Sequence, residues 1–195
     1  MEIKFNDKDL KVEAIKNGLG LGLIMVVLGI LSAYLIISSA SIWAIFLYPV
    51  CLNVILPIVI AVFFSKDLRK KIGGYWNFRR ATSGIFIMFL TSYLISSVVN
   101  VAYVKLVEPD MQAKIQTSIT DATTKMMEKQ GVDKAKIDEV IKQKDEEFKK
   151  KNSGTVMQSV QGYLIGVLFV FVFALIFGAI FKKEPPLFVS DTNEN

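Results

Sequence analysis

The chain has 195 residues, of which 52% are hydrophobic, with 23 Lys and Arg against 18 Asp and Glu and no histidine. No charged residue occurs in three stretches, residues 17–65, 81–104 and 152–181. A water-soluble domain of this size would expose much of so long an apolar run, so the sequence excludes the soluble globular class. The lack of histidine and the single cysteine also exclude His-based catalysis and Cys-rich metal sites.

The first third of the chain predicts two membrane-spanning helices. Residues 1–15 mix acidic and basic side chains, and they predict a cytoplasmic segment with a short amphipathic helix on the membrane surface. Because about 20 apolar residues span the bilayer core, residues 16–64 predict transmembrane helices 1 and 2, near 16–37 and 42–64. The polar run at 38–41 separates them. A re-entrant hairpin in place of these two crossings stays open as an alternative.

Proline and the length of the first apolar run add two expectations. Pro49 and Pro57 lie inside the second helix and predict a bend, because proline lacks the N–H of a regular helical turn. The start of the chain does not resemble a cleaved signal peptide. Its apolar run of about 20 residues is longer than a signal core, and the segment before it is not basic.

Positive charge gathers in the segment that follows. The loop at residues 65–80 carries one acid and six basic residues, namely Lys66, Arg69, Lys70, Lys71, Arg79 and Arg80. The positive-inside rule places this loop, and with it both termini, in the cytoplasm. We predict that these cations fix the topology or contact anionic lipid. We expect no nucleic-acid partner, although Tyr75, Trp76 and Phe78 give the loop a similar composition.

The rest of the chain predicts two further crossings with a polar insert between them. Residues 81–106 and 155–181 each have the length and composition of one transmembrane helix. Residues 182–195 then form a cytoplasmic tail. The insert at 107–154 falls on the opposite side of the membrane, where it predicts an extracytoplasmic helical hairpin between helices 3 and 4.

Two runs of helical periodicity support this hairpin. The first helix is predicted to begin at Pro109 and to end at Gly131. Pairs of an acid and a lysine four residues apart, such as Asp110 and Lys114, are expected to stabilise both helices. The apolar stripe consists of Met111, Ile115, Ile119, Met126, Ile137, Val140, Ile141 and Phe148. Two interpretations stay open. The two halves of the stripe pack on each other, or part of it, around Met126 and Met127, binds an extracytoplasmic protein partner.

Small residues inside the membrane predict close helix contacts, within the chain or between copies of it. They recur at helical spacing in the first, third and last apolar segments: Gly18, Gly22, Gly29, Ala33, Ser92, Ser96, Gly162, Gly166, Ala174 and Gly178. Among the membrane-embedded residues, Asn53 and Asn100 are the strongly polar ones, so they mark a candidate polar site. No charge lies within these segments, which disfavours an ion-coupled transporter. We expect no catalytic residue, no metal and no cofactor.

Several short segments from residue 66 onward resemble a known family. They are KDLR at 66–69, GGYWNF at 73–78, EPD at 108–110 and FKKEPP at 181–186. In their order and spacing they are similar to the bacterial membrane family catalogued as domain of unknown function 4199. The resemblance implies four membrane helices with a polar insert before the last, in a bacterial inner membrane. It implies no activity, because the family has no assigned one.

The sequence therefore predicts an all-α membrane protein with four transmembrane helices and an extracytoplasmic helical hairpin. Two functions stay open. The first is a non-enzymatic, self-associating protein whose hairpin contacts a partner in the cell envelope. The second is a carrier of small molecules or lipids that uses a cavity around Asn53 and Asn100.

Overall fold

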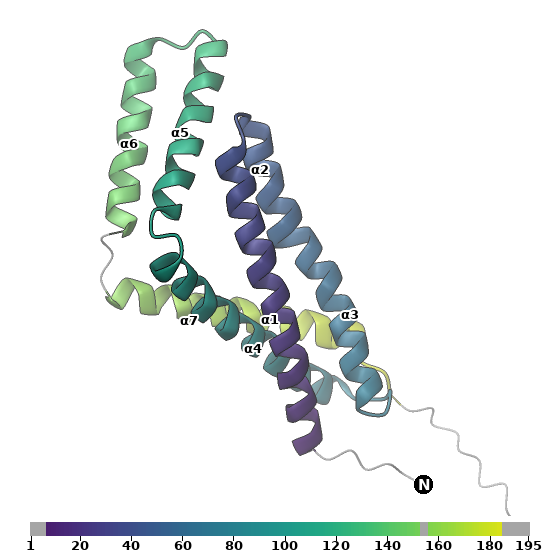
Figure 1. The fold of residues 1–195 in the computed structure, drawn as a ribbon. Coiled ribbons are helices and arrows are strands. Elements are labelled where there is room, and N and C mark those ends of the chain that lie inside the picture. Colours follow the sequence, from purple (N-terminus) through teal and green to yellow (C-terminus); the bar gives the residue numbers. More distant parts are fainter. Residues whose placement is uncertain (1–6, 153–155, 185–195) are drawn as a thin grey trace, which may run out of the picture.

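The computed structural model describes residues 7–152 and 156–184, which form a helical bundle with two helices at one end (Figure 1). Its elements are α1 (Asp7–Ser38), α2 (Ile42–Val50), the π-helical turn η1 (Cys51–Ile55), α3 (Leu56–Lys71), α4 (Phe78–Leu106), α5 (Met111–Lys129), α6 (Lys134–Asn152) and α7 (Val156–Phe181). Within the described residues there is no β-strand. The one isolated bridge pairs Trp76 with Lys183.

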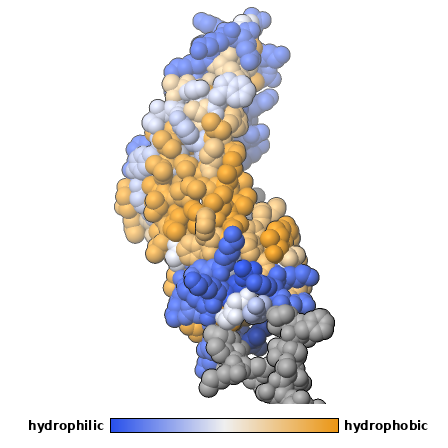
Figure 2. Space-filling view, turned by 90° about the vertical axis from the view of Figure 1, so that its right-hand side faces the viewer, coloured by the Kyte–Doolittle hydropathy of each residue, from blue (hydrophilic) through white to orange (hydrophobic). Residues whose placement is uncertain are grey.

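Four helical segments are long and apolar enough to cross a membrane. They are Asp7–Ser38, Ile42–Lys71, Phe78–Leu106 and Val160–Phe181, and the second runs through α2, η1 and α3 without interruption. On the face in Figure 2, hydrophobic residues form a band between two hydrophilic ends. The predictions of an all-α chain and of four such helices are confirmed. The protein is built as a multi-pass membrane protein.

Helix α4 is the centre of the bundle, because α1 and α7 make their most extensive contacts with it. Ile85 and Met88 of α4 are fully buried there. Phe89 meets Phe177 of α7 edge-on, with ring centroids 5.2 Å apart, in the geometry that aromatic pairs prefer. The core thus lies along α4, whereas α3 touches α7 at few points.

The first helix begins earlier than the sequence predicts. Helix α1 starts at Asp7 and continues into the membrane segment, so residues 7–15 do not form a separate surface helix. Leu10 and Ala14 are buried. A Cβ atom added to Gly84 of α4 would lie 2.7 Å from Leu10 Cδ1, so this part of α1 is packed directly on α4.

The second crossing also continues past its predicted end at residue 64. Helix α3 ends at Lys71, so the four cations at 66–71 lie on its last turns and not in a loop. Cations suit the negative end of a helix. The connection to α4 is short and turns at Gly73 and Gly74, whose φ angles of 97° and 83° favour glycine.

A widened turn lies in the segment where the prolines predict a bend. The π-helical turn η1 lies between Pro49 and Pro57. Pro57 has no N–H to offer the carbonyl four residues earlier, at Asn53, so a regular α-turn cannot form there. A single π-turn lets the helix continue past the missing hydrogen bond.

Helices α5 and α6 run side by side in Figure 1, joined by a short turn. Helix α5 begins at Met111 with Asp110 as N-cap, so the predicted start at Pro109 is two residues early. Its end matches the prediction. Gly131 has φ of 72°, and Val132 N donates to Met127 O at 3.1 Å, the closing bond of a glycine C-cap.

Candidate binding site among the membrane helices

The predicted small-residue face of α1 is used within the chain, against α4. A Cβ atom on Gly18 would lie 2.6 Å from the carbonyl oxygen of Met88, and one on Gly22 would lie 3.1 Å from that of Ser92. Ser96 Oγ donates a hydrogen bond to Gly22 O at 3.1 Å. These four small or hydroxylated residues therefore bring the two backbones together, as small residues do in membrane helix pairs.

The last helix shows a similar contact with α4 at two of its four small residues, and a third is fully buried. Gly166 faces the ring of Tyr93, Gly178 faces Thr82, and Ala174 is fully buried. Gly162 differs, since a Cβ atom there would meet no described atom within 4 Å. The same holds for Gly29 of α1. For these two glycines the described chain shows no helix contact, and the predicted contact between copies of the chain stays a prediction.

The structure brings the two predicted polar residues, Asn53 and Asn100, to one cavity of about 280 Å³. The cavity lies between α1, the α2–η1 segment, α4 and the start of α5. Its lining residues are Gly29, Ile30, Ser32, Ala33, Ile36, Pro49, Asn53, Asn100, Tyr103, Met111, Gln112 and Ile115. The open side of Gly29 and Ala33 thus faces a cavity, which explains why Gly29 has no packing partner.

The polar groups in this cavity are all uncharged. Ser32, Tyr103 and Gln112 join the two asparagines, and the remaining lining residues are apolar. Asn53 Nδ2 donates to Ser32 Oγ at 2.9 Å, which uses one of the hydrogen-bonding positions of that amide. Such a lining can orient an uncharged polar group by hydrogen bonds. None of the described lining residues carries a carboxylate or an amine.

An apolar groove adjoins this cavity and shares Asn53 with it. The groove has a volume of about 530 Å³ and lies between α3 and α7, over α1 and α4. Its walls include Ile58 of α3, Phe169 of α7 and Ser92 of α4. The groove therefore meets the polar cavity at Asn53.

A polar cluster that the sequence did not indicate lies near this cavity. Tyr34 Oη and Tyr103 Oη are 3.0 Å apart, and Tyr34 Oη also donates to Glu108 at 3.4 Å. Glu108 accepts a hydrogen bond from Lys114 and forms an ion pair with it. The Lys114 ammonium lowers the pKa of Glu108, and the carboxylate in turn raises the pKa of Lys114. Nothing in the spacing of the tyrosines marks them, because only the fold joins α1 to the end of α4.

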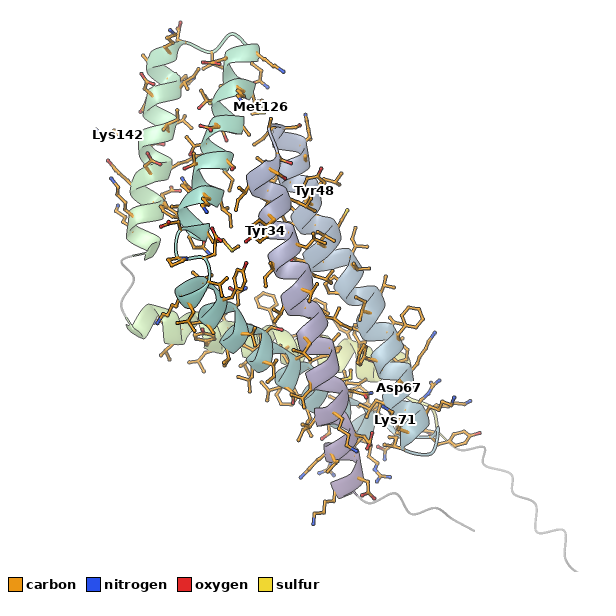
Figure 3. The ribbon with its side chains drawn as sticks, viewed as in Figure 1. Tyr34, Tyr48, Asp67, Lys71, Met126 and Lys142 are labelled. Atoms are coloured by element: carbon orange, nitrogen blue, oxygen red, sulfur yellow. The ribbon has the colours of Figure 1, made fainter. Side chains whose placement is uncertain are left out.

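A second missed group lies at the other end of the bundle, where Asn17 of α1 meets α3. Asn17 Nδ2 donates to Asp67 Oδ2 at 2.9 Å and Lys71 Nζ donates to Asn17 Oδ1 at 2.8 Å. Lys71 also pairs with Asp67 at 2.7 Å (Figure 3). In the sequence, Asn17 marked only the edge of the charge-free stretch. The structure shows that it fastens α1 to α3, with Lys71 engaged in protein contacts.

Some aromatic and basic residues in and beside the α3–α4 connection contact other parts of the protein, and others are exposed. Trp76 is 2% exposed, and its Nε1 donates to Phe181 O at 2.7 Å. Arg69 Nη1 reaches the same carbonyl at 3.5 Å, and Arg80 pairs with Asp7 at 3.1 Å. Lys66, Lys70 and Arg79 are exposed.

The apolar stripe of α5 and α6 is largely covered by the chain itself. Helix α5 contacts α1, α2 and α6. Met111 and Ile137 are buried, and the six other members are half-buried: Ile115, Ile119, Met126, Val140, Ile141 and Phe148. No large hydrophobic residue of α5 or α6 is exposed among the described side chains, and Lys142 points away from α5 (Figure 3).

No group of three potential metal ligands occurs among the described residues. No curated protein and no solved structure matches the chain. A family model described as "Protein of unknown function (DUF4199)" matches residues 16–183, which span all four apolar segments and both helices of the insert. The resemblance seen in the sequence is thus confirmed, and the chain belongs to the DUF4199 family.

Proposed function

We propose that the protein is a non-enzymatic protein of a bacterial inner membrane that binds an uncharged polar or amphiphilic molecule in the cavity at Asn53 and Asn100. The observation that carries this proposal is the meeting of two amides from separate helices in one cavity of about 280 Å³. Cavities that bind small molecules are mostly apolar with a few convergent polar groups. This cavity has that composition, and its volume is just below the usual range of about 300–1,000 Å³.

The polarity of the cavity argues for a ligand and not for packing alone. Asn53 and Asn100 are exposed at the opening of the cavity, and at membrane depth an exposed amide is destabilising unless it forms hydrogen bonds. Ser32 satisfies one position on Asn53, and each amide offers two N–H groups and a carbonyl oxygen. An uncharged ligand with hydroxyl or amide groups would satisfy the rest. The adjoining apolar groove offers such a molecule, or its acyl chain, a route from the bilayer.

The distribution of charge supports the orientation that we propose. Lys66, Arg69 and Lys70 lie near Arg79 and Arg80 at the end of the bundle away from α5 and α6. The positive-inside rule then puts that end and both termini in the cytoplasm. Helices α5 and α6 form the extracytoplasmic hairpin, and the cavity lies in the outer half of the membrane, beneath the start of α5.

The test is to purify the full chain in mild detergent, extract the small molecules that accompany it, and quantify them by mass spectrometry. We expect a bound uncharged amphiphile in the wild type and a loss of at least about tenfold in the double variant Asn53→Leu, Asn100→Leu, since each lost amide removes roughly 1 kcal/mol or more. Ser97→Leu is the matched control, because Ser97 lies on α4 but lines neither the cavity nor the adjoining groove. An unchanged extract from the double variant would refute the proposal.

A second candidate is contact with a protein of the cell envelope, together with self-association. It is supported by the place of α5 and α6 beyond the hydrophobic band (Figures 1 and 2) and by the open face of Gly162 on α7. Because the apolar stripe is covered, such a partner would meet charged side chains.

In-cell crosslinking tests this second candidate, from the exposed residues Lys129 and Lys136. A specific adduct at either position is expected if the pair α5–α6 contacts a partner, and the absence of any adduct under all growth conditions rejects it. Gly162→Leu should weaken self-association in detergent by at least about threefold while Gly29→Leu, inside the cavity wall, leaves it unchanged.

A further inference from the structure

We propose that a second cavity, between the first turns of α1 and α4, binds the phosphate of an anionic phospholipid headgroup. This cavity measures about 620 Å³ and lies at the opposite end of the bundle from the Asn53–Asn100 cavity. Its lining residues are Asp7, Leu10, Lys11, Asn77, Arg79, Arg80 and Ser83. From the sequence, all six cations of residues 65–80 were candidates for contact with anionic lipid. In the structure, two of them, Arg79 and Arg80, line this cavity, together with Lys11 of α1.

The charge of the cavity favours the binding of an anion. Among the described lining residues there are three cations, Lys11, Arg79 and Arg80, and one acid, Asp7, which pairs with Arg80 at 3.1 Å. The described lining therefore carries two more positive than negative charges. Arginine presents a planar fork of N–H groups that matches phosphate oxygens, and lysine adds a point charge.

The position of the two arginines on α4 adds to this attraction. Arg79 and Arg80 lie in the first turn of α4, and Asn77 caps the helix by accepting a hydrogen bond from Arg80 N at 2.9 Å. The positive end of the helix dipole therefore points toward the same region. Ser83, one turn further along, supplies a hydroxyl to the lining.

The cavity is built by fixed elements. Leu10 is 4% exposed and packs at Gly84, so the two helices that carry the cations are held against each other. Because the cations come from two helices in fixed contact, only their side chains have to be ordered when a ligand binds.

The depth of the cavity favours a lipid as the source of the phosphate. The charge-free stretch of α4 begins at Ala81, directly after Arg80, and Ser83 already belongs to it. The cavity therefore spans the border between the hydrophobic band and the hydrophilic end seen at the base of Figure 2. Headgroup phosphates of a bilayer lie at this border, and basic residues there attract anionic lipids.

The chain offers a matched control for the test. Lys66 and Lys70 lie on the last turns of α3, are exposed, and do not line the cavity. The variant Lys11→Gln, Arg79→Gln removes two charges from the cavity, whereas Lys66→Gln, Lys70→Gln removes two charges from the same end of the molecule. A difference between the two variants therefore reports the site and not the overall charge.

The experiment is native mass spectrometry of the full chain, titrated in detergent with phosphatidylglycerol, phosphatidylcholine or inorganic phosphate. We expect phosphatidylglycerol to bind at least about tenfold more tightly than phosphatidylcholine. The cavity variant should bind it about 30-fold more weakly, as two surface cations predict, and the control variant less than about threefold more weakly. Thermal unfolding of both variants without lipid verifies that each is folded.

Three results would overturn the inference. They are equal binding of the two lipids, an equal loss in the two variants, and tight binding of inorganic phosphate that displaces phosphatidylglycerol, which would assign the site to a soluble phosphate. The outcome is independent of the ligand proposed above, because the two cavities share no residue.

Discussion

The distance between α1 and α4 is set by single residues. Gly18 and Gly22 admit the carbonyl oxygens of Met88 and Ser92 at a separation that a larger side chain would prevent. In a bilayer the apolar side chains gain little from leaving lipid for protein, so this backbone approach is a main source of helix association. Gly29 lies on the same helix but borders a cavity, and its environment is therefore different.

This contrast predicts opposite effects of the same substitution. Gly18→Ala places a Cβ atom 2.6 Å from Met88 O and should lower the free energy of unfolding by about 1–3 kcal/mol, as overpacking does. Gly29→Ala meets no described atom within 4 Å and should be neutral or stabilising by up to about 1 kcal/mol, because alanine favours helix. Unfolding of both variants in detergent, followed by circular dichroism, measures the difference. Equal effects would contradict the assigned contact.

The Glu108–Lys114 pair gives the protein a pH-dependent contribution to stability. The pKa of Glu108 is lowered from 4.5, so the contribution is present above that value and is lost as pH falls through the lowered pKa. The pKa of Lys114 is raised from 10.5, so the contribution is also lost as pH rises through the raised value. We expect Lys114→Met to lower the melting temperature near neutral pH and to match the wild type more closely below pH 4.5.

Lys125→Met is the control for this pH series, since Lys125 is exposed on the same helix. Its melting temperature should follow that of the wild type throughout. If the Lys114→Met difference stays constant across the pH range, the ion pair is not its origin. Salt should also reduce the difference, because Lys114 is exposed and Glu108 is only half-buried.

At the scale of elements, the α3–α4 connection fastens the end of α7 to the bundle. Trp76 N donates to Lys183 O at 2.8 Å, Lys183 N donates to Trp76 O at 3.0 Å, and Trp76 Nε1 reaches Phe181 O. Lys183 Nζ lies 5.2 Å from the ring centre of Tyr75. One short connection thus holds a segment more than a hundred residues away in sequence.

Trp76→Phe should therefore destabilise this end of α7. The indole N–H bond to Phe181 O is lost inside the core, which leaves a buried carbonyl without that donor and lowers the free energy of unfolding by about 1–3 kcal/mol. Hydrogen exchange in detergent should show faster exchange in the last turns of α7. Tyr75→Phe, at a side chain that is 45% exposed, is the control and should leave exchange unchanged.

The ends of the helices could be predicted from the sequence less well than their number. The charge-free stretches gave four apolar helices, because hydrocarbon length fixes how many apolar residues a crossing needs. They did not give the start of α1 at Asp7 or the end of α3 at Lys71. Those ends depend on Leu10 packing at Gly84 and on Lys71 pairing with Asn17 and Asp67, which are contacts between distant segments.

At the scale of the whole molecule, the proposed orientation can be tested by cysteine labelling. With Cys51→Ala as background, we expect Lys129→Cys, at an exposed position at the end of α5, to react with a membrane-impermeant maleimide on intact cells and Lys70→Cys to react only after permeabilisation. The physical reason is that Lys70 lies in the cationic region that the positive-inside rule retains in the cytoplasm. The reverse labelling pattern would invert the topology.

The sequence by itself determined the class of this protein, an all-α chain with four apolar segments, because hydrophobic length and the lack of charge are properties of each segment alone. It also identified Asn53, Asn100, Gly18 and Gly22 as residues of interest. Only the tertiary structure decided their roles. It joined the two asparagines in one cavity, placed Gly18 and Gly22 against α4, and left Gly29 beside empty space. Helical periodicity says which residues share a face, but which neighbour that face meets depends on how separate helices pack.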